Sequence, residues 1–224
     1  MRSAAKRGKM EELRSNVDHT DAKQRSLDEL RSAPRFTLLI RSAKLICDSG
    51  EYLCVIRDVS ASGVRLRVFH ELPSSTKFML ELATGDRFEI ERVWEAADHA
   101  GFRFADWIDV QGFINEASPF RKRALRLKLD FPATLTADGA TAEAMVRDLS
   151  REGARVEADL PLAIRQKVKL AAKGLPPIMG IVCWRSPSAY GLVFQQVFAF
   201  DELARLAAKL QAPEQPIGAP RRYA

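Results

Sequence analysis

The sequence predicts a mainly β protein made of two tandem six-stranded antiparallel β-barrels, with a C-terminal helix after each barrel and a helical or flexible N-terminal arm. Three observations support this fold class. The chain repeats itself after 90 residues, each copy contains six short β-type runs, and each copy ends in an amphipathic helical pattern. A repeat of that length exceeds a solenoid unit of about 20 to 50 residues, so it indicates a duplicated domain.

The two copies match at identical spacing. The shared residues of the first copy are Arg57, Asp58, Ser60, Gly63, Arg65, Lys77, Leu80, Trp94, Gly101 and Phe104, and each recurs 90 positions later. The 224 residues are 46% hydrophobic, which suffices for two cores of roughly 90 to 100 residues each. We therefore divide the chain into an arm at 1–30, a first barrel at 31–118, a second barrel at 119–211 and a disordered tail at 212–224.

Short β-type runs fill the first copy. They are Ala43 to Cys47, Tyr52 to Ile56, Val64 to Phe69, Lys77 to Leu82, Phe88 to Trp94 and Gly101 to Phe104. Val64 and Leu66 alternate with Arg65 and Arg67, which predicts one buried and one solvated face. Six such strands separated by turns favour a small closed barrel, because closure removes exposed sheet edges.

The second copy repeats this pattern, with Asp138-Gly139 as its first hairpin turn. A helical stripe follows each barrel, formed by Val110, Phe113, Ile114 and Ala117 in the first copy and by Leu203, Leu206, Ala207 and Leu210 in the second. Pro119 and Pro213 end these helices. We expect both stripes to pack against the barrels, and we expect Trp94 and Trp184 to lie in the cores.

The charge and the cysteine content indicate the kind of partner and the cellular compartment. The formal net charge of +6 favours an anionic partner such as nucleic acid, an acidic membrane surface or a phosphorylated small molecule. Cys47, Cys54 and Cys183 are odd in number and irregularly spaced, which fits a reducing compartment. No apolar run follows the basic start of the chain, so we expect a cytoplasmic protein without membrane insertion.

Two motifs carry a candidate binding chemistry. Asp58, Ser60 and Gly63 form a turn between two strands, where Asp and Ser bond their own backbone and Gly permits positive φ. Arg31 and Arg35, four positions apart around a proline, present two guanidinium forks. Such forks suit phosphates and the O6/N7 edge of guanine, and a carboxylate suits the N–H donors of guanine. Together the motifs predict a site for a guanine nucleotide with exposed phosphates.

These motifs, in this order, resemble the PilZ domain family. The family's marks are an RxxxR segment, a [D/N]xSxxG turn about twenty residues later, and a distal strand pair with Trp and a Gly-x-x-Phe ending. In this chain they correspond to Arg31 to Arg35, Asp58 to Gly63, and Trp94 with Gly101 to Phe104. The resemblance covers residues 31 to about 117 and then 121 to about 210.

The resemblance implies a receptor for the second messenger cyclic di-GMP. By the family pattern, Arg31 and Arg35 grip phosphates and guanine Hoogsteen edges, while Asp58, Ser60 and Gly63 hold a guanine over the barrel surface. Ligand binding would then order the arginine segment and rearrange the neighbouring arm.

The second copy departs from the family pattern at its basic segment. Aligned on Arg126, the first RxxxR position holds Lys122, which has charge without the planar guanidinium fork. Arg121 or Arg123 could substitute after a small register shift. The remaining motif residues Asp148, Ser150 and Gly153 are present. We therefore expect the first site to dominate and treat the second as a possible site.

The leading interpretation is a non-enzymatic receptor and adaptor that passes the cyclic di-GMP level to an unidentified protein partner in motility, exopolysaccharide or biofilm control. One alternative is a ligand-independent PilZ scaffold for such machinery. Another is a sequence-tolerant nucleic-acid binder using Arg121 to Lys128, which has few interleaved aromatic residues. Metal-ligand spacing, a P-loop and a base for Ser60 are not recognisable in the sequence, so we expect no catalytic residue, metal or cofactor.

Overall fold

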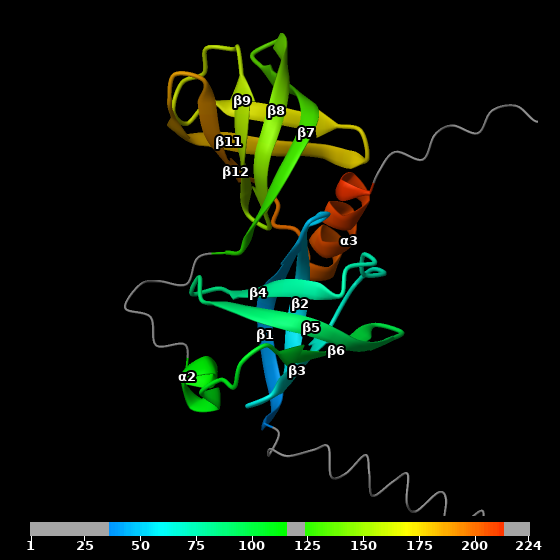
Figure 1. Ribbon diagram of the computed structural model, residues 1–224. Coiled ribbons are helices and arrows are strands. Elements are labelled where there is room, and N and C mark those ends of the chain that lie inside the picture. The colour runs from blue at the N-terminus through cyan, green and yellow to red at the C-terminus, as the bar shows by residue number, and fades with distance from the viewer. Residues whose placement is uncertain (1–35, 116–123, 213–224) are drawn as a thin grey trace, which may run out of the picture. The chain divides into compact units, whose positions relative to one another are not determined.

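A computed structural model describes residues 36–115 and 124–212. Its first barrel consists of β1 (Phe36–Cys47), β2 (Gly50–Ser60), β3 (Gly63–Arg67), β4 (Lys77–Leu82), β5 (Arg87–Ala96) and β6 (His99–Phe104), followed by α2 (Val110–Asn115) (Figure 1). All neighbouring strands are antiparallel, and they close in the order β1-β2-β3-β6-β5-β4.

The second barrel has the same topology. It consists of β7 (Arg126–Ala137), β8 (Ala140–Ser150), β9 (Gly153–Ala158), β10 (Lys167–Ala172), β11 (Leu175–Arg185) and β12 (Ala189–Phe194), followed by α3 (Phe200–Gln211) (Figure 1). Its strands close in the order β10-β11-β12-β9-β8-β7, which is the first barrel's order read backwards around the ring. Two six-stranded antiparallel barrels, each followed by a helix, are therefore confirmed.

Alternating burial along the strands produces the two cores. In β7 every second residue is buried, including Leu127, Leu129 and Leu135, while the residues between them face outward. The first core is formed in the same way around Leu45 and Leu66, which are fully buried. Period-two alternation places one side of each strand inside the barrel, as the sequence predicts.

Tight turns set the hairpin registers. Asp138 and Gly139 both have positive φ, 48° and 83°, and they connect the paired ends of β7 and β8. Positive φ at both central residues is the requirement of a type I′ turn, whose twist matches that of the flanking strands. The Asp138-Gly139 hairpin predicted from the sequence is confirmed.

The helices bury the expected apolar residues. Phe113 of α2 is buried against Phe88 and Phe104, with ring centroids 5.1 Å and 6.0 Å away. In α3, Leu203 and Ala207 are fully buried in the second core. Both amphipathic stripes therefore pack onto their barrels, as expected for helices with an apolar face about one-third of their circumference wide.

The start of each barrel contains a bulge that fixes how the two copies align. The register of β1 against β2 shifts between Thr37 and Arg41, and that of β7 against β8 shifts between Lys128 and Phe131. The bulge of the first copy is one residue longer. As a result, a residue of β7 that precedes the bulge corresponds to the residue 91 positions earlier in the first copy. Arg126 is therefore the equivalent of Arg35.

An ion-pair cluster around the buried Lys44 joins four strands of the first barrel. The Lys44 ammonium lies 3.0 Å from Glu51 and 2.9 Å from Glu81, and Lys44 is only 5% exposed. Arg87 Nε lies 2.7 Å from the other oxygen of Glu81. Burial by itself would raise the pKa of Glu81, but hydrogen bonds and charge attraction from Lys44 and Arg87 lower it overall.

Candidate functional site

The predicted Asp-x-Ser-x-x-Gly motif forms the connection between β2 and β3. The Ser60 hydroxyl accepts a hydrogen bond from the Gly63 N–H (3.2 Å) and donates one to the Gly63 carbonyl (3.3 Å). Ser60 is buried, and its two hydrogen bonds to Gly63 stabilise the turn. Ser150 makes the same two bonds with Gly153 at 3.1 Å and 3.0 Å.

Backbone hydrogen bonds hold this turn against the end of the barrel. Phe104 donates its N–H to the carbonyl of Ser62, and Ile108 donates to that of Ala61, each at 3.0 Å. The second copy repeats both bonds, from Phe194 to Glu152 and from Phe198 to Arg151. The motif turn is therefore a fixed platform in both barrels.

Gly63 is required for a reason other than the one that its turn position suggests. Its φ is not in the positive region occupied by Gly50, Gly85, Gly139 and Gly174. Instead, a Cβ atom at Gly63 would lie 2.8 Å from the carbonyl oxygen of Phe102 on the neighbouring strand. Close strand approach, and not positive φ, selects glycine at this position.

The two motif carboxylates differ in their hydrogen bonding. Asp58 is buried and pairs with Arg65 through Oδ2, but its buried Oδ1 has no hydrogen-bond partner among the described residues. In the second copy, Asp148 Oδ1 accepts from Arg126 Nη1 (2.6 Å) and from the Arg155 N–H (3.2 Å). A buried carboxylate oxygen without a donor costs roughly 1 to 3 kcal/mol, so Asp58 retains a strong capacity to bind one.

Strand pairing places four residues in one row across the outside of the first barrel. Asp58 of β2 lies opposite Arg65 of β3, Arg65 lies opposite Gly101 of β6, and Gly101 lies opposite Trp94 of β5. Directly opposed residues in a sheet share a face. The row therefore combines a carboxylate, a guanidinium and an exposed indole on one surface.

Trp94 is 45% exposed, so the prediction that it belongs to the core is wrong. Period-two alternation assigns Trp94 to the same face as Ile90, which is buried. A bulge between Arg92 and Trp94 reverses that assignment and turns the indole outward. The ring then lies over Gly101, where an added Cβ would overlap the indole nitrogen.

The second barrel contains the same row, formed by Asp148, Arg155, Gly191 and Trp184. Trp184 is 42% exposed, so its predicted core position is also wrong, and a bulge between Val182 and Trp184 is again the cause. Sequence reasoning recognised the Trp and Gly of this strand pair as a shared motif but missed that each indole lies exposed over its glycine. The shared spacing of Trp and Gly in both copies was the available signal.

The structure brings together only part of the predicted site. Asp58, Ser60 and Gly63 gather at the β2–β3 turn, and Arg126, Asp148, Ser150 and Gly153 gather in the second barrel. The predicted residues Arg31, Arg35, Lys122 and Arg123 lie outside the described residues. Arg126 is the first residue of β7 and binds Asp148. It therefore shows how an arginine at the start of a barrel's first strand reaches the carboxylate of the motif.

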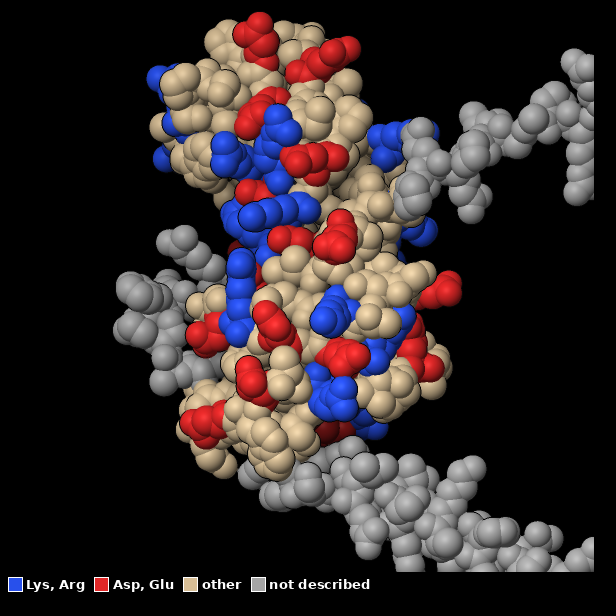
Figure 2. Space-filling model, viewed as in Figure 1, with Lys and Arg blue, Asp and Glu red and all other residues tan. Residues whose placement is uncertain are grey.

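The charge around the rows is mixed. Arg147 forms ion pairs with Asp130 (3.0 Å) and Glu157 (2.7 Å), and Arg67 pairs with Asp98 (2.9 Å). Figure 2 shows acidic and basic side chains interspersed over the visible face of the described chain.

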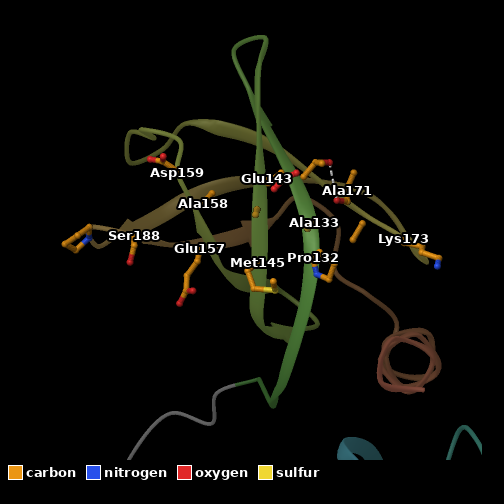
Figure 3. Close-up of a pocket in the computed structure, with 14 residues that line it drawn as sticks. Pro132, Ala133, Glu143, Met145, Glu157, Ala158, Asp159, Ala171, Lys173 and Ser188 are labelled. Carbon is orange, nitrogen blue, oxygen red and sulfur yellow. Dashed lines mark hydrogen bonds between the residues drawn. The ribbon is translucent and has the colours of Figure 1, made fainter. Parts of the chain in front are cut away.

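One pocket of the second barrel lies away from the motif residues of that barrel. It measures about 950 Å³ and is lined by parts of β7, β8, β9 and β10 with Pro187 and Ser188. Figure 3 shows its lining, in which Thr134 donates a hydrogen bond to the Ala171 carbonyl (3.3 Å). Ala133, Ala144 and Ala158 have small side chains, which leaves space in this pocket. Neither Asp148 nor Ser150 lines the pocket.

Within residues 36–115 and 124–212, no group of three or more His, Cys, Asp or Glu side chains could hold a metal ion. The helices of that region are also too short or too polar to cross a bilayer.

Comparison with known proteins identifies the family of both repeats. The PilZ domain profile matches residues 29–113 and 120–210. None of the curated proteins is significantly similar to the chain in sequence.

The solved structures that match the chain include PlzA of Borreliella burgdorferi in complex with c-di-GMP (12% identity, TM-score 0.32, covering 85% of this chain and 98% of PlzA). A second is the MrkH–c-di-GMP complex of K. pneumonia (13% identity, TM-score 0.30, covering 80% and 94%). A third is YcgR of Escherichia coli in complex with c-di-GMP (11% identity, TM-score 0.29, covering 76% and 82%).

Proposed function

The chain belongs to the PilZ domain family, and from this premise we propose that it is a receptor for cyclic di-GMP that binds the nucleotide chiefly at its first barrel. The observation that carries the proposal is the buried Oδ1 of Asp58, which has no donor among the described residues. That oxygen lies beside the motif turn and begins the surface row that ends at Trp94.

The chemistry of the row suits a guanine base. The Asp58 carboxylate accepts hydrogen bonds from the guanine N–H groups, which fills the place left at Oδ1. Trp94 offers an exposed aromatic face for stacking, a contact worth roughly 1 to 3 kcal/mol per base. Arg31 and Arg35 supply forks for the phosphates and the O6/N7 edge.

The second barrel is the weaker site. Its Arg126 already binds Asp148, so a guanine that uses this carboxylate must displace an existing charge-assisted hydrogen bond. Lys122 also replaces one of the two guanidinium forks. We therefore assign one dominant nucleotide site per chain, with Lys122, Arg123, Arg126, Asp148, Ser150 and Gly153 as a secondary site.

In this proposal the protein is an adaptor without catalytic chemistry. Binding at Arg31 and Arg35 changes the conformation of the adjoining arm, and a cytoplasmic protein partner in motility, exopolysaccharide or biofilm control reads the change. A nucleotide-independent scaffold is the alternative. The unfilled hydrogen-bonding capacity of Asp58 favours the receptor.

Titration calorimetry with cyclic di-GMP tests this assignment. Arg35→Ala should weaken binding by roughly tenfold to a hundredfold, because a charge-assisted hydrogen bond contributes on the order of 1.5 to 3 kcal/mol. The matched variant Arg126→Ala, at the equivalent position of the second copy, should change the dominant affinity little. A folded Arg35→Ala protein with unchanged affinity would remove the first-site assignment.

Asp58→Ala and Asp148→Ala form a second matched pair. The first should abolish most of the measured heat, whereas the second should leave the dominant site intact. Equal losses from both variants would show that the two barrels have been ranked wrongly. Absence of any binding heat from the folded native protein would favour the scaffold.

A further inference from the structure

One outer face of the second barrel is apolar although it faces solvent. Met179 and Ile181 of β11 and Val193 of β12 are 44%, 36% and 49% exposed. Ile181 and Val193 are directly opposed across the two strands, and Val197 beyond β12 is 56% exposed. We call these four residues the apolar face.

The first barrel carries polar residues at three of these four positions, Glu89, Glu91 and Arg103, and Trp107 at the fourth. Lys77, Glu91 and Arg103 are opposed across β4, β5 and β6, as Lys167, Ile181 and Val193 are across β10, β11 and β12. In the first barrel Arg103 Nη2 lies 2.8 Å from Glu91 Oε2. The duplicated fold therefore tolerates an ion pair here, and the second copy has Ile and Val instead.

Lysine residues border the apolar face on one side. Lys167 lies opposite Ile181 and Lys169 lies opposite Met179, so both cations stand in the same outward row as the apolar side chains. Neither lysine forms an ion pair with another described residue of the chain. Two such faces would bring their lysines together, which makes self-pairing unfavourable and an acidic, partly apolar surface a better complement.

The first barrel offers such a surface. A groove of about 780 Å³ runs over its outer face and is lined by the apolar side chains Ile46, Met79 and Trp107. Trp107 is 71% exposed. Four carboxylates, those of Asp48, Glu89, Glu91 and Asp106, line the same groove together with the cations Lys77 and Arg103, and Arg103 pairs with Glu91. The groove is therefore acidic on balance, and within residues 36–115 and 124–212 neither Glu89 nor Asp106 has an ion-pair partner. We call this surface the acidic groove.

We propose that the chain self-associates by placing the lysine-bordered apolar face of one copy in the acidic groove of a second copy. Lys167 and Lys169 then approach Glu89 and Asp106, while Ile181 and Val193 cover Trp107. Each copy carries both surfaces, so two copies can exchange the contact reciprocally and close as a dimer. This inference is independent of nucleotide binding.

The internal repeat supplies a variant that should preserve the fold. Ile181→Glu combined with Val193→Arg gives the second barrel the Glu91–Arg103 pair of the first. Sedimentation velocity over a concentration series should show the native chain converting from one-chain to two-chain mass, and this double variant should raise the dissociation constant at least tenfold. The control Ile40→Glu changes an exposed apolar residue of β1 outside both surfaces and should leave association unchanged.

Charge exchange tests which surfaces meet. Lys167→Glu/Lys169→Glu should dissociate the dimer, and so should Glu89→Lys/Asp106→Lys. Mixing the two variants should restore a mass of two chains, because each contact in the mixed dimer again joins opposite charges. A native chain that stays monomeric at all concentrations overturns the proposal. Association that survives the Ile181→Glu/Val193→Arg change, or variants that fail to rescue each other, overturns it equally.

Discussion

At the scale of single residues, the two copies differ most at one oxygen atom. Asp148 Oδ1 receives two donors, while the buried Asp58 Oδ1 receives none from the described residues. The sequence places an identical Asp-x-Ser-x-x-Gly motif at both positions, so the motif alone cannot rank the sites. In the second copy Arg126 and the Arg155 N–H supply the donors, whereas in the first copy Arg65 pairs with the other oxygen, Oδ2, of Asp58.

Trp94 provides a residue-scale prediction for the nucleotide site. Trp94→Ala should weaken cyclic di-GMP binding by about fivefold to a hundredfold, because base stacking on an aromatic ring contributes roughly 1 to 3 kcal/mol. Trp184→Ala removes the equivalent indole of the second barrel and should affect the dominant affinity little. Calorimetry of both variants decides the matter, and identical affinities for Trp94→Ala and the native chain would exclude stacking at this position.

The three cysteines should react at very different rates. Cys54 is fully buried and burial raises the pKa of its thiol strongly, so the reactive thiolate is scarce at neutral pH. Cys183 is exposed. Timed alkylation of the native protein followed by mass spectrometry should label Cys183 first and leave Cys54 unmodified until unfolding. Early modification of Cys54 would contradict its position in the core.

At the scale of strands, sequence periodicity predicts the barrels and fails at the bulges. Alternation in Val64 to Arg67 and Phe102 to Phe104 is observed as predicted, because uninterrupted strands keep period two. The first strand was predicted from Ala43 but begins at Phe36, since a bulge between Thr37 and Arg41 interrupts its alternation. The outward turn of Trp94 has the same cause. Bulges depend on how a strand pairs with its neighbour, and the composition of the strand alone does not show this pairing.

The ion pairs of Glu81 predict how the first barrel responds to acid. Its pKa is lower in the folded chain than in the unfolded chain, so the ionised carboxylate stabilises the fold above the unfolded pKa. That contribution is lost as the pH falls through the folded pKa. Denaturant unfolding at several pH values should therefore show a smaller loss of stability in acid for Glu81→Gln than for the native chain.

Glu71→Gln is the matched control, because Glu71 is exposed and forms no ion pair with a described residue. It should follow the native pH profile. If Glu81→Gln and Glu71→Gln gave the same profile as the native chain, the cluster with Lys44 and Arg87 would contribute nothing to acid sensitivity.

At the scale of the whole molecule, the two copies share one fold and differ at their surfaces. Both barrels contain the motif turn and the Trp-over-Gly pair. The face around Ile181 is apolar where the first barrel has Glu91, and the second arginine segment has Lys122 where the first has Arg31. The repeat therefore predicts the fold of both halves from either one, while the functional differences lie in outward residues that the cores do not constrain.

This asymmetry gives the final prediction, on hydrogen exchange across the whole chain. Saturating cyclic di-GMP should slow amide exchange most at residues 31 to 35, because in the proposed receptor Arg31 and Arg35 bind the nucleotide at the dominant site, and only weakly at 121 to 126. A bound state shifts a conformational equilibrium only through contacts that differ between the two states, and Arg126 already holds its contact with Asp148. Mass spectrometry of labelled peptides measures both segments in one experiment. Strong protection at 121 to 126 with none at 31 to 35 would reverse the order of the sites, and absence of protection in both segments would favour the nucleotide-independent scaffold.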